Sequence, residues 1–337
     1  MSLLVVTVDT EADDLWSLPA TYTCRNVARL PAFQAVCERH GVRPTYLVSH
    51  EVMADVEARA QMVELAGRQR CEIGTHLHGF STPPEKPLTA DDRRAIPFAY
   101  EYPASVVREK LDYLTQLIEA TFGRRPRTIR WGQWGLNGSL VPIMEELGYF
   151  VDTTVTPGID WRDFSEERAA TAPSFVGAPL APYSLDRDDV RRAGQSSILE
   201  VPATVVYQAR WHRPVHEALS RIRLGRVSRR VRLAPRWLRP FPWVSGEALF
   251  DVAQAAVRAG APLLNMMLHS SELLPGGSPY ASTQADVDRT LANLDAFFGR
   301  LAARGLRSVG LEETFGLFGR PSTARPSVAV PAVSASA

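Results

Sequence analysis

Two carboxylates follow the first apolar segment of the chain. Asp9 and Glu11 stand two residues apart in the run Val8–Asp13. In a strand such residues share one face, so both side chains emerge at its C-terminal end. In α/β barrels and open parallel sheets that end carries the active site. The pattern favours one carboxylate as a base and the other as a metal ligand; the alternative is a solvated acidic loop.

A histidine pair follows a second apolar segment. His76 and His78 come directly after residues 72–75 and project to the same side of an extended chain. Imidazole nitrogens suit zinc, iron, nickel or copper. Together with one of the carboxylates, the pair makes a three-ligand site that leaves a position for water, as hydrolytic zinc requires. A His-x-His sequence also arises by chance, so the pair indicates a metal site mainly in combination with the acidic motif.

Three further residues stand at the ends of expected strands. His269 follows an apolar run and precedes a Gly276-Gly277 loop that is suited to border a substrate cleft. Arg130 can hold a carboxylate through a bidentate contact, and Asp152 can orient a histidine. The alternatives are a structural histidine, a surface arginine beside packing aromatics, and an aspartate that caps a turn.

Strand-like and helix-like segments alternate along the chain, which is typical of a parallel α/β fold. We expect about seven strand–helix units, interrupted once. The predicted strands are residues 3–8, 45–48, 72–75, 128–130, 149–153, 263–268 and 307–311. The predicted helices are residues 25–39, 58–66, 106–122, 140–147, 246–258 and 285–303. This organisation predicts one barrel domain over residues 1–320, with an insertion at about 156–244 and a disordered tail at 321–337.

The insertion contains the strongest charge asymmetry in the sequence. Residues 207–245 hold ten arginines and one acidic residue, Glu217, a local charge of +9 in a chain of +1. One interpretation is a solvated face that pairs with the acidic remainder. Another is peripheral contact with an anionic membrane, because basic amphipathic helices with aromatics bind such surfaces. A third is a polyanion, although no recognised nucleic-acid module accompanies the arginines and no nucleic-acid partner is expected.

Composition excludes several other classes of protein. Of the 337 residues, 45% are hydrophobic and 22% charged, as in an ordinary globular protein. The three cysteines lack CxxC spacing, so a disulfide framework or a cysteine zinc site is not expected. The N-terminus has no basic region before its short apolar run, and we therefore expect a cytoplasmic protein.

The residues taken together resemble the polysaccharide deacetylase family, carbohydrate esterase family 4. An acidic motif, a Gly-x-His, an arginine, an aspartate and a Leu-x-His occur in that family's order, over residues 3–154 and 245–318. The segments VDTE, EIGTHLHGFSTPP and LHSSELLPGGSP resemble an intracellular branch found in surface-polysaccharide and cell-wall gene neighbourhoods. The resemblance implies a distorted (β/α)7 barrel, here with a basic helical insertion. It implies a hydrolase that removes an N-acyl group, in the first place acetyl, from an amino sugar or sugar conjugate in cell-surface glycan metabolism. A lipid-linked sugar is the substrate that would suit membrane contact through the basic segment.

The resemblance also implies catalytic roles. Asp9 matches the catalytic base and Arg130 the arginine that tethers it. His269 matches the general acid, and Asp152 matches the acid that orients this histidine.

The implied cofactor is a divalent metal, with zinc the expected ion. Glu11 and His76 match metal ligands, and His78 is the nearest replacement for a second histidine that the family usually places where this chain has Phe80. The longer Glu11 and the His-x-His spacing leave two other hypotheses open. One is a catalytically degenerate barrel that acts as a binding or scaffold component at a membrane, and the other is a hydrolase of a non-sugar amide.

Overall fold

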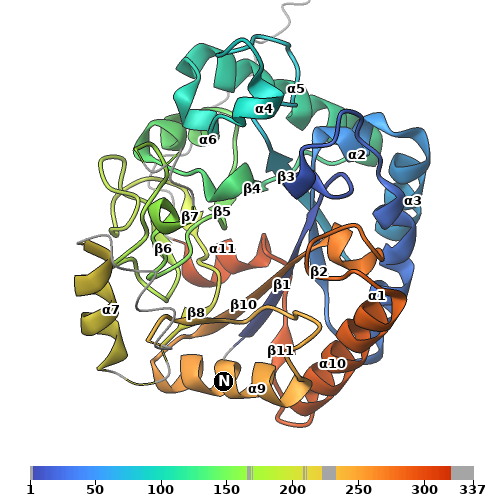
Figure 1. Cartoon of the computed structure of the whole chain (residues 1–337), viewed down its shortest axis with the longest axis vertical. Helices are drawn as coiled ribbons and strands as arrows, with labels where there is room; N and C mark the ends of the chain where they lie inside the picture. The colour runs from blue at the N-terminus through green and yellow to red at the C-terminus, as the bar shows by residue number, and fades with distance from the viewer. Residues whose placement is uncertain are drawn as a thin grey trace, which may run out of the picture.

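Parallel strands ringed by helices build the frame of the molecule (Figure 1). The structure, a computed structural model, describes residues 3–164, 168, 170–207, 209, 211–221 and 233–319. Seven strands lie side by side and parallel in the main sheet: β1 (Leu3–Thr10), β2 (Pro44–Val48), β3 (Glu72–Leu77), β4 (Thr128–Trp131), β5 (Val151–Asp152), β7 (Leu199–Glu200) and β10 (Leu263–His269). The sheet order is β10-β1-β2-β3-β4-β5-β7-β6, and the predicted (β/α) barrel is thereby confirmed.

Two short strands complete the main sheet and two more form a separate antiparallel sheet. β11 (Arg307–Ser308) pairs in parallel with β1, and β6 (Tyr183–Ser184) pairs antiparallel with β7. The separate sheet consists of β8 (Val205–Val206) and β9 (Arg236–Trp237).

Helices cover the outer face of the strands. Those around the ring are α1 (Leu30–Arg39), α2 (His50–Ala54), α3 (Val56–Gly67), α5 (Ala104–Phe122), α6 (Val141–Glu146), α9 (Gly246–Arg258) and α10 (Gln284–Ala302). Among the described residues, three more lie elsewhere: α4 (Asp92–Ala95), α7 (His212–Arg221) and α11 (Glu313–Phe318). The predicted helix at 25–39 is divided into a 3-10 turn, η2 (Arg25–Arg29), and α1, which has Pro31 in its first turn.

The side chains of β1 alternate between the apolar core under the helices and the interior of the barrel, where the candidate site residues lie. On β1, Leu4, Val6 and Val8 face the helices and belong to the main apolar core. The intervening side chains point into the barrel, where Val5 packs with Leu47 and Leu263 in a second apolar cluster. Because side chains two apart share a face, the inward row of β1 continues through Thr7 to Asp9.

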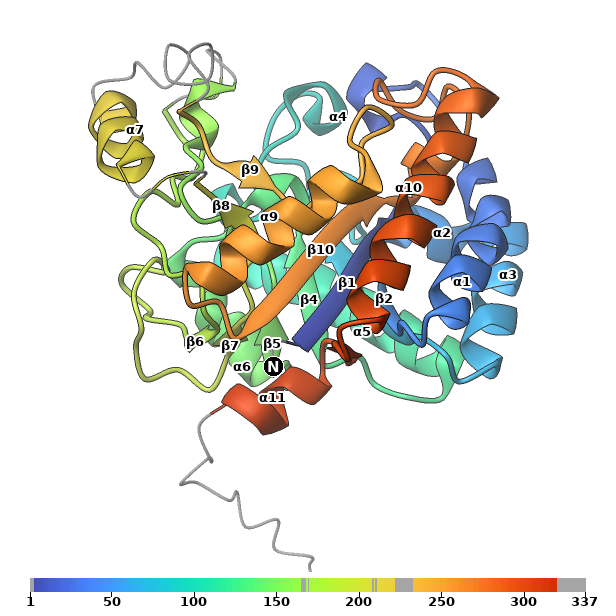
Figure 2. The ribbon, with the colours of Figure 1, turned by 90° about the horizontal axis from the view of Figure 1, so that it is seen from below.

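The two ends of the barrel differ. α11 lies across the end where β1 begins, and its Phe315 and Phe318 pack against the interior cluster (Figure 2). The carboxyl ends of the strands lie at the opposite end, where polar side chains replace apolar ones. That end is therefore the one available for a site.

The segment predicted as an insertion contributes to the barrel itself. Residues 156–244 supply β7 and β6 to the main sheet. After β7, the amide of Ala203 donates to Val155 O at 3.0 Å and that of Thr204 to Asn265 O at 2.9 Å. These bonds link the β5 side of the sheet to β10 and bring its two edges together.

Two predictions fall partly or wholly outside the described residues. The tail at 321–337 is outside them, as are residues 222–232 in the most basic part of 207–245. α7, which precedes that gap, lies at the edge of the molecule in Figure 1. Among the described residues, no helix has the length and apolar character needed to cross a bilayer.

Candidate active site

Arg130 anchors Asp9 inside the barrel. Its Nη1 donates to Asp9 Oδ1 at 2.6 Å, its Nη2 to Thr7 Oγ1 at 2.8 Å, and its Nε to the carbonyl of Thr153 at 2.9 Å. Arg130 and Asp9 are both almost fully buried. Burial opposes ionisation of Asp9, but the positive charge of Arg130, together with His76 and His269, more than offsets it and holds the carboxyl pKa below its usual value. Asp9 is thus a fixed, ionised carboxylate.

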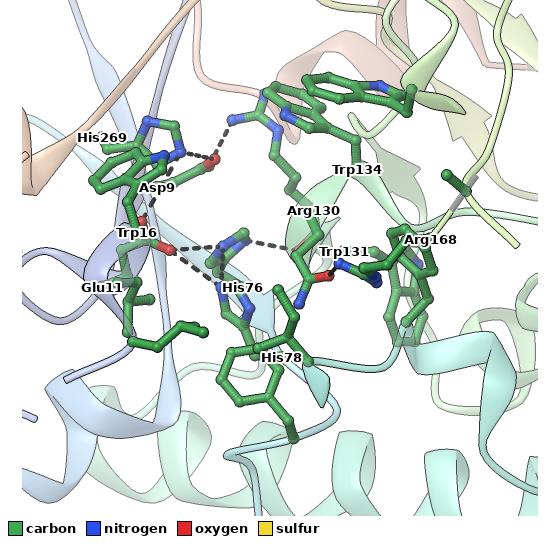
Figure 3. Close-up of a pocket in the computed structure, with 18 of the residues that line it drawn as sticks. Asp9, Glu11, Trp16, His76, His78, Arg130, Trp131, Trp134, Arg168 and His269 are labelled. Atoms are coloured by element: carbon green, nitrogen blue, oxygen red, sulfur yellow. Dashed lines mark hydrogen bonds and ion pairs between the residues drawn. The ribbon is translucent and has the colours of Figure 1, made fainter. Parts of the chain in front are cut away.

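Glu11, His76 and His78 converge beside this pair (Figure 3). Glu11 Oε2 lies 3.3 Å from His76 Nε2 and 3.1 Å from His78 Nε2, and the two imidazole nitrogens are 3.0 Å apart. All three residues are buried. Burial raises the pKa of Glu11, yet His269 and the two histidines more than offset this and hold it well below its usual value. The ionised carboxylate of Glu11 therefore favours a positive charge between it and the two histidines.

The donor atoms of this group fit a divalent transition metal. Around a tetrahedral zinc, with Zn–N near 2.0–2.1 Å, ligand atoms stand roughly 3.3 Å apart, close to the separations found here. His76 Nδ1 lies 3.0 Å from the carbonyl of Arg130. That carbonyl is an acceptor, so Nδ1 carries the proton and the Nε2 lone pair faces Glu11. A backbone partner of this kind commonly fixes a metal-ligating histidine.

His269 enters from the neighbouring strand. β1 and β10 pair with Asp9 opposite His269, so strand register alone puts both residues at the same level. His269 Nε2 lies 3.7 Å from Asp9 Oδ2 and 3.9 Å from Glu11 Oε1. The opposite ring nitrogen, Nδ1, lies 2.9 Å from Glu272 Oε1. The Nε2 side of the ring is therefore the one that faces the other site residues.

Asp152 lies apart from this group. The resemblance implied that Asp152 orients His269, and its position in the structure differs from that role. Val151 packs in the barrel interior, so the next side chain on β5, Asp152, points to the outside. Its carboxylate accepts bonds from the amide and hydroxyl of Thr154 at 2.9 and 3.0 Å. It also bonds to Glu200, its register partner on β7. The acid that contacts His269 is Glu272.

Asp152 and Glu200 form a buried carboxyl pair on the outer face of the sheet. Both are fully inaccessible to solvent. Burial, together with the charge of Asp152, raises the pKa of Glu200 well above its usual value. We expect Glu200 to be protonated and to donate to Asp152, a structural role.

Glu272 and Arg239 are site residues that the sequence did not single out. Glu272 lies in the 3-10 turn η7 (Ser270–Leu273) after β10, and Arg239 follows β9. Both are buried, and Arg239 Nη2 donates to Glu272 Oε1. Glu272 stands three residues after His269, a spacing that was readable. Arg239 was hidden among the arginines of the basic segment.

Aromatic side chains wall the cleft above these residues, which has a volume of about 360 Å³. Trp16 meets His269 edge-on with ring centroids 5.0 Å apart, and Arg130 lies under Trp134 at 5.0 Å. Gln133 and Trp134 both adopt positive φ, 58° and 60°, which is uncommon away from glycine and concentrates at functional sites. The walls of the cleft are thus mainly aromatic and apolar, with Arg168 among them, and most of the charged groups lie on its floor.

Fold and site together define an α/β barrel with a candidate divalent-metal site at the carboxyl ends of its strands. Two solved structures share this fold. A protein from Mycobacterium smegmatis, provisionally assigned as a polysaccharide deacetylase, aligns with a TM-score of 0.53 at 14% identity over 97% of this chain and 96% of that one. A protein from Parabacteroides distasonis, provisionally assigned as a glycoside hydrolase/deacetylase, aligns at 0.61 and 10% identity over 94% of this chain and 70% of that one.

The comparisons establish the fold of polysaccharide deacetylases for this chain. No protein-family model and no curated protein matches the sequence.

Proposed function

We propose that this protein is a metal-dependent hydrolase of the polysaccharide deacetylase kind. Its substrate would be an amino sugar or sugar conjugate, lipid-linked sugars included, from which it removes an N-acyl group, in the first place acetyl. The observation that carries the proposal is the convergence of the Glu11–His76–His78 group with Asp9 and His269 on the floor of one cleft. The cytoplasmic location and the intracellular branch remain predictions from the sequence.

The residues present suit amide hydrolysis. A divalent metal held by Glu11, His76 and His78, zinc being the proposed ion, would supply Lewis-acid polarisation of the acyl carbonyl. Asp9, which accepts a bond from Arg130, would take a proton from the attacking water. His269, whose Nε2 lies 3.7 Å from Asp9 Oδ2, would give a proton to the departing amine nitrogen as the carbon–nitrogen bond breaks. Acid–base steps of this type each contribute about 10²–10⁴-fold.

A first prediction concerns the metal. Elemental analysis of the purified chain should give about one transition-metal ion per molecule. The His76→Ala/His78→Ala variant, which loses two of three donor side chains, should give none. Acetate release from N-acetylated glucosamine oligomers should follow the same pattern.

Each outcome of this experiment is informative. A metal in the wild type without release of acetate, from sugars or from simple amides, would contradict the hydrolase. A chain that binds no metal even after reconstitution would favour the scaffold hypothesis. One observation supports that second candidate, since two imidazole nitrogens 3.0 Å apart can share a proton with no metal present.

A further inference from the structure

His269 has a buried acid on the side of its ring that faces away from the other site residues. Glu272 Oε1 lies 2.9 Å from His269 Nδ1, within hydrogen-bond distance. Glu272 is 2% exposed and stands on η7, which immediately follows β10. The backbone that ends the strand therefore delivers both residues, and no long-range contact is needed to align them.

Arg239 braces this acid. Its Nη2 donates to the same Oε1 atom of Glu272, and its guanidinium carbon lies over two aromatic rings, at 4.7 Å from the centroid of Phe241 and 5.1 Å from that of Tyr280. Burial opposes ionisation of Glu272, but Arg239 and the bond to His269 together more than offset it and keep the carboxyl pKa below its usual value. Glu272 is accordingly an acceptor with no proton to give.

The identity of the acceptor decides which nitrogen of His269 carries the proton. Arg239 Nη2 also lies 2.9 Å from His269 Nδ1, and either group could in principle bond to that nitrogen. A bare Nδ1 lone pair would face the negative charge of Glu272 at 2.9 Å, which is repulsive. A protonated Nδ1 instead makes a charge-assisted bond to Oε1, where the arginine also donates.

We infer that Glu272, braced by Arg239, is the positioning residue that fixes the ring of His269 with Nδ1–H toward the carboxylate and Nε2 toward the cleft. Asp152 cannot take this part, because it lies on the outer face of the sheet with Thr154 and Glu200. The inference deepens the proposed function where it concerns turnover. Its claim about the histidine ring stands without that function.

The ring claim is tested by NMR on the full chain labelled with ¹⁵N-histidine. The His269 signals, identified by their loss in His269→Gln, should show a protonated Nδ1. The Arg239→Met/Glu272→Leu variant replaces a buried ion pair with apolar groups of similar volume, a change that folded proteins often tolerate. It should lose the fixed Nδ1–H, whereas Glu272→Gln should keep it because the amide oxygen still accepts.

Two control variants make the result decisive. Arg108→Met/Glu146→Leu applies the same two substitutions to an exposed pair, 2.8 Å apart, and should leave the His269 signals unchanged. Asp152→Asn should leave the nitrogen assignment unchanged as well. An unprotonated Nδ1 in the wild type, or an unaltered ring in Arg239→Met/Glu272→Leu, would overturn the inference. A shift in Asp152→Asn alone would return the role to Asp152.

Turnover supplies a second measurement. With an N-acetylated glucosamine oligomer as substrate, Arg239→Met/Glu272→Leu should lower kcat roughly 10–100-fold with little change in KM, as loss of an orienting partner does. Glu272→Gln should restore part of that loss. If no variant and no wild type turns over an acylated sugar, the proposed function fails while the NMR result still decides the positioning role.

Discussion

Glu72 is a buried ionisable side chain that lies away from the cleft, at the end of the barrel that α11 covers. It begins β3, four residues before His76, and is 7% exposed. Its carboxyl accepts bonds from Thr128 Oγ1 at 2.9 Å and the amide of Glu312 at 3.0 Å. Burial dominates these bonds and raises the pKa of Glu72 to about 7 from 4.5.

This shift has a definite sign for stability. A carboxyl whose pKa is higher in the folded state stabilises the fold below the unfolded pKa, and that contribution is lost as pH rises through the folded pKa. The wild type should therefore lose up to about 3 kcal/mol of unfolding free energy between roughly pH 4.5 and pH 7 from this group. Glu72→Gln, which cannot ionise, should remove that slope.

Urea unfolding of both proteins at several pH values measures the difference. Glu72→Gln should equal or exceed the wild type in stability above pH 7. Equal pH slopes for the two proteins in this window would show that Glu72 ionises as freely when folded as when unfolded. Glu64→Gln, an exposed glutamate that pairs with Arg68, is the matched control and should leave the slope unchanged.

At the scale of elements, the turn after β4 influences the position of His78 in the Glu11–His76–His78 group. Gly132 opens this turn, and a Cβ atom there would lie 2.6 Å from His78 Nδ1 and 2.8 Å from two of its ring carbons. Real Cβ atoms essentially never approach that closely, so the ring would have to move. The absence of a side chain at Gly132 thus allows His78 to reach Glu11 and His76.

Gly132→Ala should therefore weaken metal binding without unfolding the protein. We expect a loss of roughly 10–100-fold in metal affinity, the size usual when the support of a ligand is disturbed. Titration of the metal-free chain with zinc measures it. Gly67→Ala is the matched control, because Gly67 lies in α3 with open space at its Cβ position. Unchanged affinity in Gly132→Ala would mean that His78 is not a ligand.

At the scale of the whole molecule, the basic segment 207–245 is only partly a free surface. Arg239 is buried in the cleft, and Arg213 pairs with Glu217 at 2.8 Å. Six of the ten arginines, at positions 210, 223, 226, 229, 230 and 232, lie outside the described residues. Trp211 and Trp243 are 60% and 65% exposed, so aromatic side chains accompany the charge.

The hypothesis of membrane contact predicts co-sedimentation with anionic vesicles at low salt. Each basic residue near such a surface contributes about 1 kcal/mol. The attraction should fade at high salt, since the screening length falls from about 10 Å at 0.1 M to about 3 Å at 1 M. Neutral vesicles are the control. Protein that stays in the supernatant with anionic vesicles at low salt would remove the membrane hypothesis.

The sequence determined the strands and the order of the site residues. Apolar runs predicted β1, β2, β3, β4 and β10, because the strands of a parallel sheet are buried on both faces and so consist mostly of apolar residues. The acidic motif, the histidine pair and His269 follow strands whose ends meet at one face of a parallel sheet. Their meeting in one cleft could therefore be anticipated without coordinates, although their catalytic roles stay proposals.

Tertiary structure decided what depends on contacts between distant segments. β5 has two residues, too few for an alternation to be read, so only its pairing with β7 revealed that Asp152 faces outward. Arg239 meets Glu272 because β9 returns the chain to the cleft, and nothing local distinguishes it from the other nine arginines of its segment. Closure of the barrel by residues 203–204 likewise rests on backbone bonds from Ala203 to Val155 and from Thr204 to Asn265 in β10. Local pattern fixes which face a long strand buries, whereas the partners of a side chain are set by packing across the fold.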